Sequence, residues 1–549
     1  MVQTSRRLFV AVLLFTLCVF AIPPLLAATG TSATGGPNWT SLLPPLIAIG
    51  LAILLREVIG SLLLGILVGA FLLTSGSPGE ALLLLPTDLF LNALANPGHA
   101  AIVLFSLMLG AMVGVLARSG GMAGIVRALQ KMTRGRRGGM IVTWLMGLII
   151  FFDDYANTLL VGNTMRPYAD RLKLSRAKLA YIVDATSAPI ASIAVISTWV
   201  GFEIGLIEEA TSHLPNVQDG YLIFLQSIPF TAYSIFTLIL VGAVAWWQRD
   251  FGPMLNTEKL ALDGNDPSAE ESGKTMESAE AGKYGVLLAL VPVGLVILTT
   301  FAGLYLSGRA GAGPDAALFE ILGAADSAQV LLAASFFGMV SAAILAVYPG
   351  RLKVQAVSDA LIDGVKAMMP AMVILLLAWS LGDITDRLGT AEYVIDAVSG
   401  NLAPAMLPMV VFLIAAVIAF STGTSWGVMA ILIPIAIPLA YEMASLGGHA
   451  GDPVHGVFYG TVGAVLAGAT FGDHCSPISD TTILSSMASG CKHIEHVRTQ
   501  IPYALLAAGV SIVFGYLPSG LGFSPWIGLV LGAALIVFLP KLLMKPVEG

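Results

Sequence analysis

Apolar runs long enough to cross a bilayer recur along the whole 549-residue chain. A membrane-spanning helix needs about 20 consecutive, mostly apolar residues. Such segments are expected at 39–56, 58–76, 99–117, 139–165, 179–206, 221–247, 284–306, 328–349, 367–387, 403–445, 454–489, 501–518 and 524–543. The pattern therefore predicts an all-α polytopic membrane protein with about 11–12 transmembrane helices.

Two of these apolar segments are predicted to be re-entrant hairpins. The segment 139–165 has basic loops on both sides, and basic loops stay in the cytoplasm. Both flanks therefore belong on one side, with FFDDYANT (151–158) at the tip. The segment 403–445 carries FSTGTSWG at 420–427 and lacks basic flanks, so we expect it to enter from outside. Irregular backbone at such tips is tolerated where it is buried in protein or faces a watery cavity.

The two halves of the chain resemble each other, which predicts two inverted repeats. LGAMVGVLARSGGMA (109–123) aligns with LAWSLGDITDRLGTA (377–391), and the same spacing superimposes the two hairpin tips. SAPIASIAVIST (187–198) aligns with CSPISDTTILSS (475–486). Many transporters consist of two inverted copies whose broken helices meet near the bilayer midplane. Each repeat is therefore expected to contribute one hairpin and one discontinuous helix.

The expected domain organisation has five parts. They are an N-terminal signal-like or first transmembrane segment (1–38), the first inverted repeat (39–248), a cytoplasmic polar linker (249–283), the second inverted repeat (284–518) and an extra C-terminal transmembrane helix (519–549). The linker is poor in apolar residues and is expected to be mobile. The first segment reads as a cleavable signal or as an uncleaved span, and without cleavage both termini are expected in the cytoplasm.

Composition excludes several classes of function. The chain is 56% hydrophobic and 11% charged, whereas soluble domains carry about 25% charged residues. Its three cysteines form no CxxC pair, so neither a disulfide framework nor a zinc site is predicted. We find no phosphate-binding loop, dinucleotide fingerprint or basic aromatic patch. We therefore expect no enzyme activity, no cofactor and no nucleic-acid partner, only the lipid bilayer and a transported solute.

Polar residues gather at four predicted helix breaks, near 153, 187, 422 and 477. Carboxylates at membrane depth are costly and indicate a functional site by default. A site with excess carboxylate binds Na⁺ through oxygen ligands and releases it on protonation. The candidate ion- or substrate-binding residues are Asp153, Asp154, Asn157, Thr158, Asp184, Ser187, Ser421, Thr422, Thr424, Ser425, Asp473, His474, Ser476, Ser479, Asp480 and Thr481. Asp154 and Asp480 are the predicted ligands of one Na⁺.

Structural roles stay open for several of these residues. Asp184 and Asp473 also suit helix capping, although Asn or Ser would cap without a buried charge. The hydroxyl groups at 421–425 suit hydrogen bonds within the hinge. His474 suits a proton relay, an aspartate partner or a packed polar residue.

FFDDYANTLLVG (151–162) and FGDHCSPISDTT (471–482) resemble the NhaC-type sodium/proton antiporter family of the ion transporter superfamily. The resemblance extends from about residue 40 to 518. It implies an inverted-repeat fold with two hairpins, a plasma (inner) membrane location, Na⁺/H⁺ exchange by alternating access and an elevator-like homodimer.

The same family includes exchangers of organic solutes such as malate and lactate. The alternative is therefore a Na⁺- or H⁺-coupled exchanger of small organic acids or amino acids. An arginine at a hairpin tip would favour an anion, and neither tip has one, because Arg166 and Arg171 lie beyond the first hairpin. The sequence thus favours Na⁺/H⁺ exchange.

Overall fold

The computed structural model describes most of the chain and is nearly all helical, which confirms the all-α prediction. The described residues are 38–55, 58–121, 124, 135–215, 217–269, 285–312, 321, 325–348, 352–390, 393, 402–444 and 456–547. The predicted N-terminal segment lies outside them, except for Asn38.

The first half of the chain consists of long apolar helices joined by short helices and turns. They are η1 (Trp39–Leu42), α2 (Leu43–Leu55), α3 (Ile59–Leu73), α4 (Pro78–Leu84), the π-helical η2 (Leu85–Phe90), α5 (Leu91–Ala95), α6 (Pro97–Arg118), α8 (Gly135–Ile149), α9 (Asp154–Arg171), α10 (Arg176–Asp184), α11 (Ala188–Ala191), α12 (Val200–Thr211), α13 (Gly220–Ser227), η3 (Ile228–Phe230), α14 (Ala232–Trp247) and α15 (Gly252–Leu262).

The second half is also built from long apolar helices joined by shorter ones. Its helices are α16 (Gly285–Ala312), α18 (Ser327–Val347), α19 (Val354–Arg387), η4 (Pro404–Met406), α21 (Leu407–Thr422), α22 (Ser425–Ala444), α23 (Gly456–Cys475), α24 (Asp480–Ser489), α25 (His493–Val510), the π-helical η6 (Ser511–Tyr516), α26 (Leu517–Gly520) and α27 (Pro525–Leu543). The strands are β1 (Arg249–Asp250) and β2 (Lys545–Pro546), which pair antiparallel.

Eight helices of the described chain are long and apolar enough to cross a membrane. They are Pro97–Arg118, Gly285–Ala310, Gln329–Val347, Val354–Arg387, Pro404–Thr422, Ser425–Ala444, His493–Gly520 and Pro525–Leu543. A ninth candidate is the pair Gly220–Phe230 and Ala232–Trp247, which is bent by 49°. The protein is therefore a multi-pass membrane protein.

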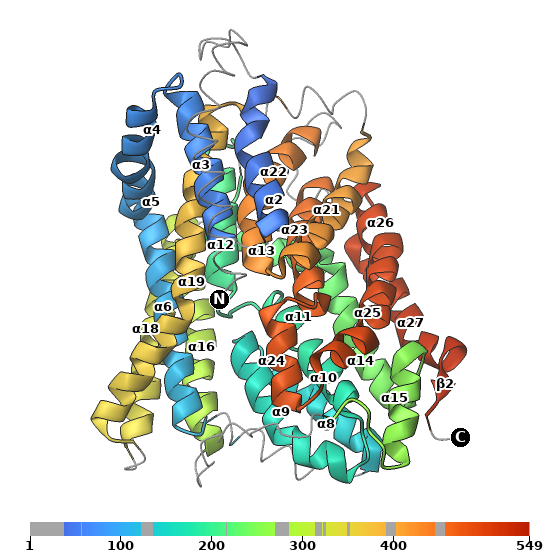
Figure 1. Cartoon of the computed structure of the whole chain (residues 1–549). Helices are drawn as coiled ribbons and strands as arrows, with labels where there is room; N and C mark the ends of the chain where they lie inside the picture. Colours follow the sequence, from blue (N-terminus) through green and yellow to red (C-terminus); the bar gives the residue numbers. More distant parts are fainter. Residues whose placement is uncertain are drawn as a thin grey trace, which may run out of the picture.

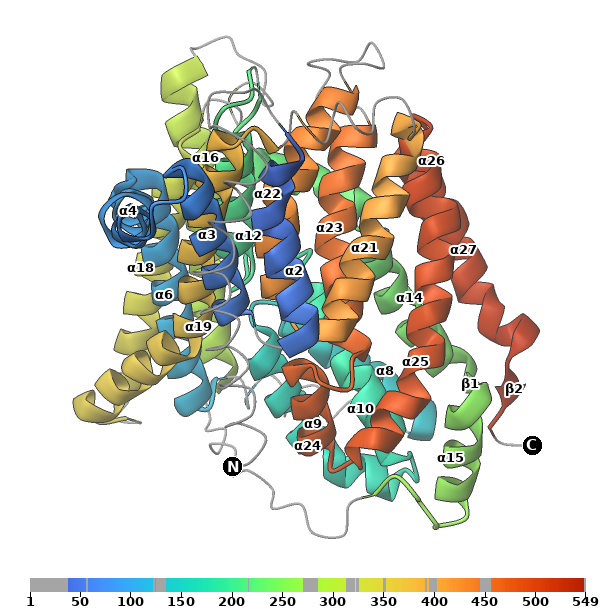
Figure 2. The same cartoon turned by 45° about the horizontal axis from the view of Figure 1, so that its top comes forward.

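The helices form two groups that lie next to each other (Figures 1 and 2). One group contains α3 to α6, α16, α18 and α19, and the other contains the two predicted hairpins and the broken helices. Within the first group α6 and α19 lie very close. A Cβ atom on Gly114 of α6 would be only 2.3 Å from the carbonyl oxygen of Ala360 on α19. Small residues permit this close backbone approach between membrane helices.

Both predicted hairpins are helix pairs joined by a short break. Helices α8 and α9 are separated by residues 150–153, and α21 and α22 by Gly423 and Thr424. Gly423 has φ 72°, a left-handed conformation that favours glycine. The α8–α9 pair lies in the lower half of Figure 1 and the α21–α22 pair in the upper half. Two inverted copies would produce this arrangement, and the repeat itself remains a prediction.

The first part of the predicted mobile linker is folded, which corrects that expectation for residues 249–269. Helix α15 buries Glu258, whose carboxylate accepts hydrogen bonds from Arg136 Nη2 at 2.6 Å and from the Ser175 backbone N–H at 2.7 Å. Burial raises the pKa of Glu258, and the nearby Lys178 and Arg136 oppose that rise. Asp250, Glu258 and Ser268 are buried, and each has a hydrogen-bond partner far away in the sequence. Residues 270–283 lie outside the described chain.

These contacts place the basic loops at one end of the molecule. Besides the Arg136–Glu258 pair, the Arg176 backbone N–H donates to Asp266 at 2.8 Å. The Lys492 backbone N–H donates to the carbonyl oxygen of Ser268 at 2.7 Å. We call this end, which carries α8, α9, α10, α15 and α24, the basic end (Figure 1).

A buried ion pair at the basic end gives a stability prediction. Lys178 and Asp250 are at most 2% exposed and form a salt bridge, and Tyr503 Oη also donates to Asp250 Oδ1 at 2.5 Å. Removing one partner of a buried pair costs about 3–5 kcal/mol, because the other charge stays buried and unpaired. We expect Asp250→Asn to lower the melting temperature of the purified protein. The exposed Asp263→Asn should leave it unchanged, and equal melting temperatures for the two variants would contradict this role.

Candidate functional site

A cavity of about 160 Å³ lies where the helix breaks meet. Its lining residues are Asp153, Asp154, Tyr155, Thr198, Ala367, Met368, Pro370, Ile374, Thr424, Trp426 and Asp480. Three carboxyl groups therefore face one space, and none of these lining residues is Lys, Arg or His. We call it the central cavity.

Asp154 and Asp480 reach the central cavity because each begins a helix after a break. Asp154 is the first residue of α9 and is 2% exposed, and its Oδ2 has no hydrogen-bond partner among the described residues. Asp480 is the first residue of α24 and is exposed. Helix N-termini favour negative charge, and Asp480 Oδ1 accepts from the Thr481 backbone N–H at 2.9 Å. Tyr155 Oη donates to Asp480 Oδ2 at 2.5 Å and so joins the first hairpin to α24.

Asp473, at the end of α23, is held by three hydroxyl groups and does not line the central cavity. Ser479 Oγ donates to it at 2.5 Å, Thr481 Oγ1 at 3.1 Å and Ser425 Oγ at 3.2 Å. These bonds close the break between α23 and α24 and tie it to the second hairpin. The carboxylate is thereby satisfied by the protein itself.

Asp184 and His474 lie at the ends of α10 and α23, and one side chain connects them. Gln500 Nε2 on α25 donates to Asp184 Oδ2 at 2.7 Å and also to the backbone carbonyl oxygen of His474. His474 Nδ1 hydrogen-bonds Tyr233 Oη at 2.7 Å. Sequence reasoning missed Gln500. The available signal was its spacing of four residues from His496, which puts both side chains on one helix face.

The remaining candidate residues mainly stabilise backbone near the breaks. The side chains of Ser187, Ser421, Thr422 and Ser476 donate to the carbonyl oxygens of Asp184, Val417, Ile418 and Phe420 at 2.7–2.8 Å. Asn157 Nδ2 donates to two carbonyl oxygens, of Gly147 and Thr186, at 2.8 and 2.7 Å. Thr158 is buried, and its hydroxyl has no partner in the described chain. Among the predicted hydroxyl groups, only that of Thr424 belongs to a residue lining the central cavity.

A second cavity of about 210 Å³ lies toward the opposite end and includes Glu209, His213, Asp386 and Glu442 in its lining. Residues of α19 and α22 line both cavities, and α12 begins just after the central cavity and ends at the second. Packed aromatic side chains lie between the two cavities.

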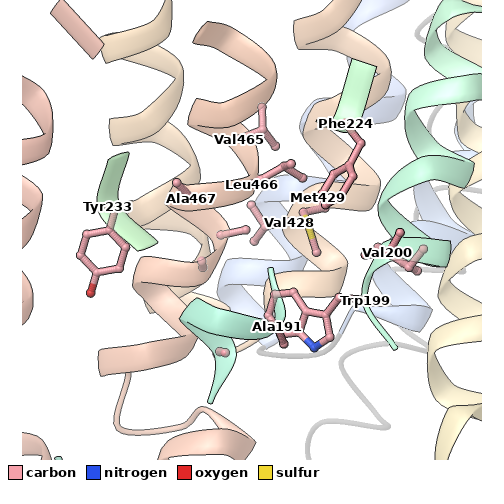
Figure 3. Close-up of a cluster of buried hydrophobic side chains, with 14 of the residues drawn as sticks. Ala191, Trp199, Val200, Phe224, Tyr233, Val428, Met429, Val465, Leu466 and Ala467 are labelled. Atoms are coloured by element: carbon pink, nitrogen blue, oxygen red, sulfur yellow. The ribbon is translucent and has the colours of Figure 1, made fainter. Parts of the chain in front are cut away.

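The aromatic layer is built from the start of α12, the start of α22 and Trp379 of α19. Trp199, Phe202 and Trp379 are at most 1% exposed. Trp426 packs on Trp199 with ring centroids 5.8 Å apart and on Phe202 at 4.5 Å. Figure 3 shows Trp199 together with Val428 of α22 in the buried cluster. The central cavity is therefore separated from the second cavity by packed side chains.

Comparisons with known proteins find transporters. A model of the Na⁺/H⁺ antiporter family matches residues 190–521. An uncharacterized protein of Haemophilus influenzae is 35% identical over 498 residues, which are 88% of this chain and 92% of that protein. A second protein of that organism, an uncharacterized Na⁺/H⁺ antiporter, is 32% identical over 165 residues, 29% of this chain and 32% of its own.

Two further similarities concern a characterised relative and a solved fold. The malate-2H⁺/Na⁺-lactate antiporter of Bacillus subtilis is 28% identical over 166 residues, 30% of this chain and 33% of that protein. The crystal structure of the Alcanivorax borkumensis YdaH transporter aligns with a TM-score of 0.57 at 14% identity, over 86% of this chain and 90% of that chain. The likeness to the YdaH transporter shows a shared fold only.

Proposed function

Because the chain belongs to the Na⁺/H⁺ antiporter family, we propose that it exchanges Na⁺ for H⁺ across the plasma (inner) membrane by alternating access. It is a membrane antiporter and not an enzyme. In this proposal the repeats are residues 39–248 and 284–518, the basic end faces the cytoplasm, and the protein works as a homodimer.

The observation that carries the proposal is the acidic lining of the central cavity. Asp153, Asp154 and Asp480 face a space with no basic lining residue. An anion would be repelled there, whereas a cation would be attracted. No three His, Cys, Asp or Glu side chains of the described chain are placed to hold a metal ion together. Na⁺ as substrate would therefore use Asp154 and Asp480 with the Thr424 hydroxyl and water, which are oxygen ligands suited to a hard cation.

Alternating access is supported by the two cavities. They are separated by the aromatic layer, and α19 and α22 line both. A repacking of this layer would open the carboxylates of the central cavity to the second cavity. The change would involve the first residues of α12 and α22 and Trp379 of α19.

The proposal predicts that protons and Na⁺ compete. A proton on Asp154 or Asp480 removes the charge that attracts Na⁺. Lowering the pH should therefore raise the apparent KM for Na⁺, by up to about tenfold per pH unit for each competing proton, while the saturated rate changes less. Na⁺-dependent proton flux at several pH values checks this. A saturated rate that falls at constant apparent KM would indicate that protons bind elsewhere.

A transport assay distinguishes exchange of a cation from exchange of an organic solute. Purified protein in proteoliposomes with a trapped pH dye is given Na⁺, K⁺, Li⁺, malate, lactate, arginine or ornithine singly. Proton flux with Na⁺ alone supports the proposal. Flux that requires an organic acid or amino acid would establish the alternative, exchange of small organic solutes, which the similarity to the malate and lactate antiporter favours.

A further inference from the structure

We propose that the protein binds the headgroup of an anionic phospholipid where α8, α14 and α27 meet near the basic end. Arg137 and Lys541 are the cations of this site, and each lies over an indole ring of α14, that of Trp246 or Trp247. We call these four residues the headgroup site. The inference does not depend on which solute the protein exchanges.

Helix α14 brings the two cations to one place. It packs against both α8 and α27, and its last two residues are Trp246 and Trp247. The guanidinium carbon of Arg137 on α8 lies 5.5 Å from the centre of the Trp246 ring, and Lys541 Nζ on α27 lies 5.1 Å from that of Trp247. The face of an indole ring attracts a cation. Positive charges from two helices are therefore positioned at the same end of α14 (Figures 1 and 2).

The backbone that carries Lys541 is fastened to the end of α14. Arg249 Nη1, two residues beyond α14, donates to the carbonyl oxygens of Lys541 at 3.0 Å and of Met544 at 2.9 Å. Trp247 Nε1 donates to the carbonyl oxygen of Val537 at 2.7 Å. The strands β1 and β2 pair directly beyond these contacts. The end of α27 is therefore held in place, while the Lys541 side chain is exposed.

Arg137 and Lys541 form no ion pair with a carboxylate of the described chain. Asp250 and Glu258, which follow α14 in the sequence, are buried and are already bound by Lys178 and Arg136.

Other exposed basic side chains do have carboxylate partners. The pairs are Arg118 with Asp363, Arg387 with Asp383, and Arg498 with Glu495. The headgroup site instead presents exposed positive charge, to which Lys545 of β2 adds a third exposed cation. Basic residues between membrane helices on the cytoplasmic side bind anionic lipid headgroups.

The outer face of α27 provides a surface for the acyl chains. Ile527, Leu531 and Phe538 are each more than half exposed, and α27 is long and apolar enough to cross a membrane. These residues and Lys541 follow one another at helical spacings of 4, 7 and 3 residues, which put their side chains on one face. An apolar stripe therefore leads along α27 to the positive charge. This combination complements a phospholipid rather than a soluble anion.

The test follows the melting temperature of the purified full-length protein in detergent micelles. Phosphatidylglycerol or phosphatidylcholine is added in increasing mole fraction. A lipid that binds the folded state raises the melting temperature, so we expect a rise with phosphatidylglycerol and not with phosphatidylcholine. A cation near an anionic surface contributes about fivefold in affinity. The double variant Arg137→Gln with Lys541→Gln should therefore need an about 25-fold higher mole fraction of phosphatidylglycerol for half of the rise.

Two further variants separate the loss of these charges from other effects. Arg118→Gln with Lys366→Gln also removes one arginine and one lysine, which lie 3.6 and 3.8 Å from Asp363, and should respond like the wild type. Arg137→Lys with Lys541→Arg keeps both charges and should keep the response. The measured quantity is the rise caused by the lipid, so a variant that is less stable without lipid does not imitate the result.

Glycerol 3-phosphate distinguishes a lipid from a soluble anion, because it carries the phosphate without acyl chains. We expect no rise in melting temperature with it, and an equal rise would overturn the assignment to a lipid. Equal responses to phosphatidylglycerol in the wild type and in Arg137→Gln with Lys541→Gln would overturn the headgroup site. Equal loss in the Arg118 and Lys366 variant would overturn it as well, since net charge alone would then explain the response.

Discussion

Asp480→Asn and Asp154→Asn should each abolish coupled Na⁺/H⁺ exchange while the protein still inserts and folds. Asn keeps the size and the helix-capping ability of Asp and loses only its charge. Loss of one charged partner at a binding site costs about 2–5 kcal/mol. We therefore expect the apparent KM for Na⁺ to rise by about 100-fold or more, so that Na⁺-dependent proton flux in proteoliposomes is lost at Na⁺ concentrations that saturate the wild type.

The matched control is Asp363→Asn on α19. Its side chain is 63% exposed and pairs with Arg118 at 3.6 Å, outside the central cavity. Transport near the wild-type rate in Asp480→Asn, at normal membrane abundance, would mean that Asp480 only caps α24. The cation site would then be sought at Asp153 and Asp473.

A leucine at Gly468 or Gly472 should prevent formation of the folded protein. A Cβ atom on Gly472 would lie 2.2 Å from Ala419 Cβ and 2.3 Å from the backbone of the same residue. A Cβ atom on Gly468 would lie 2.7 Å from the carbonyl oxygen of Phe412. Backbone atoms cannot move aside as a flexible side chain can, so α21 and α23 would have to separate. Overpacking costs about 1–3 kcal/mol, and more where the backbone must shift.

Fluorescence-detected size exclusion of detergent extracts measures this effect as loss of the monodisperse peak. Gly294→Leu in α16 and Gly509→Leu in α25 are suitable controls, because a Cβ atom there meets nothing within 4 Å. A normal peak for Gly472→Leu would show that the two helices do not need close contact.

The sequence predicted the helix breaks because their signals are local. Gly423, Pro477 and the aspartates that begin α9 and α24 specify irregular backbone from their own residue types. The prediction of a mobile linker was wrong for 249–269 because Glu258 is buried by Arg136, 122 residues away. Such pairing cannot be predicted from local composition.

Side-chain direction limited the prediction of the site in the same way. The repeat alignment placed Ser421 and Thr422 opposite Asp153 and Asp154, yet both hydroxyl groups donate to carbonyl oxygens four residues earlier in α21. Ser and Thr in the last turn of a helix readily form such bonds. Thr424, in the break itself, is outside the helix and lines the central cavity. Gln500 was missed because its partners belong to two other helices.

Gln500 constrains which movements the molecule can make. Its amide nitrogen holds the end of α10 through Asp184 and the end of α23 through His474 at the same time. A motion that drew the two breaks apart would rupture both bonds in the membrane interior, where no water replaces them. We therefore expect the end of α10 and the end of α23 to stay together in any conformational change.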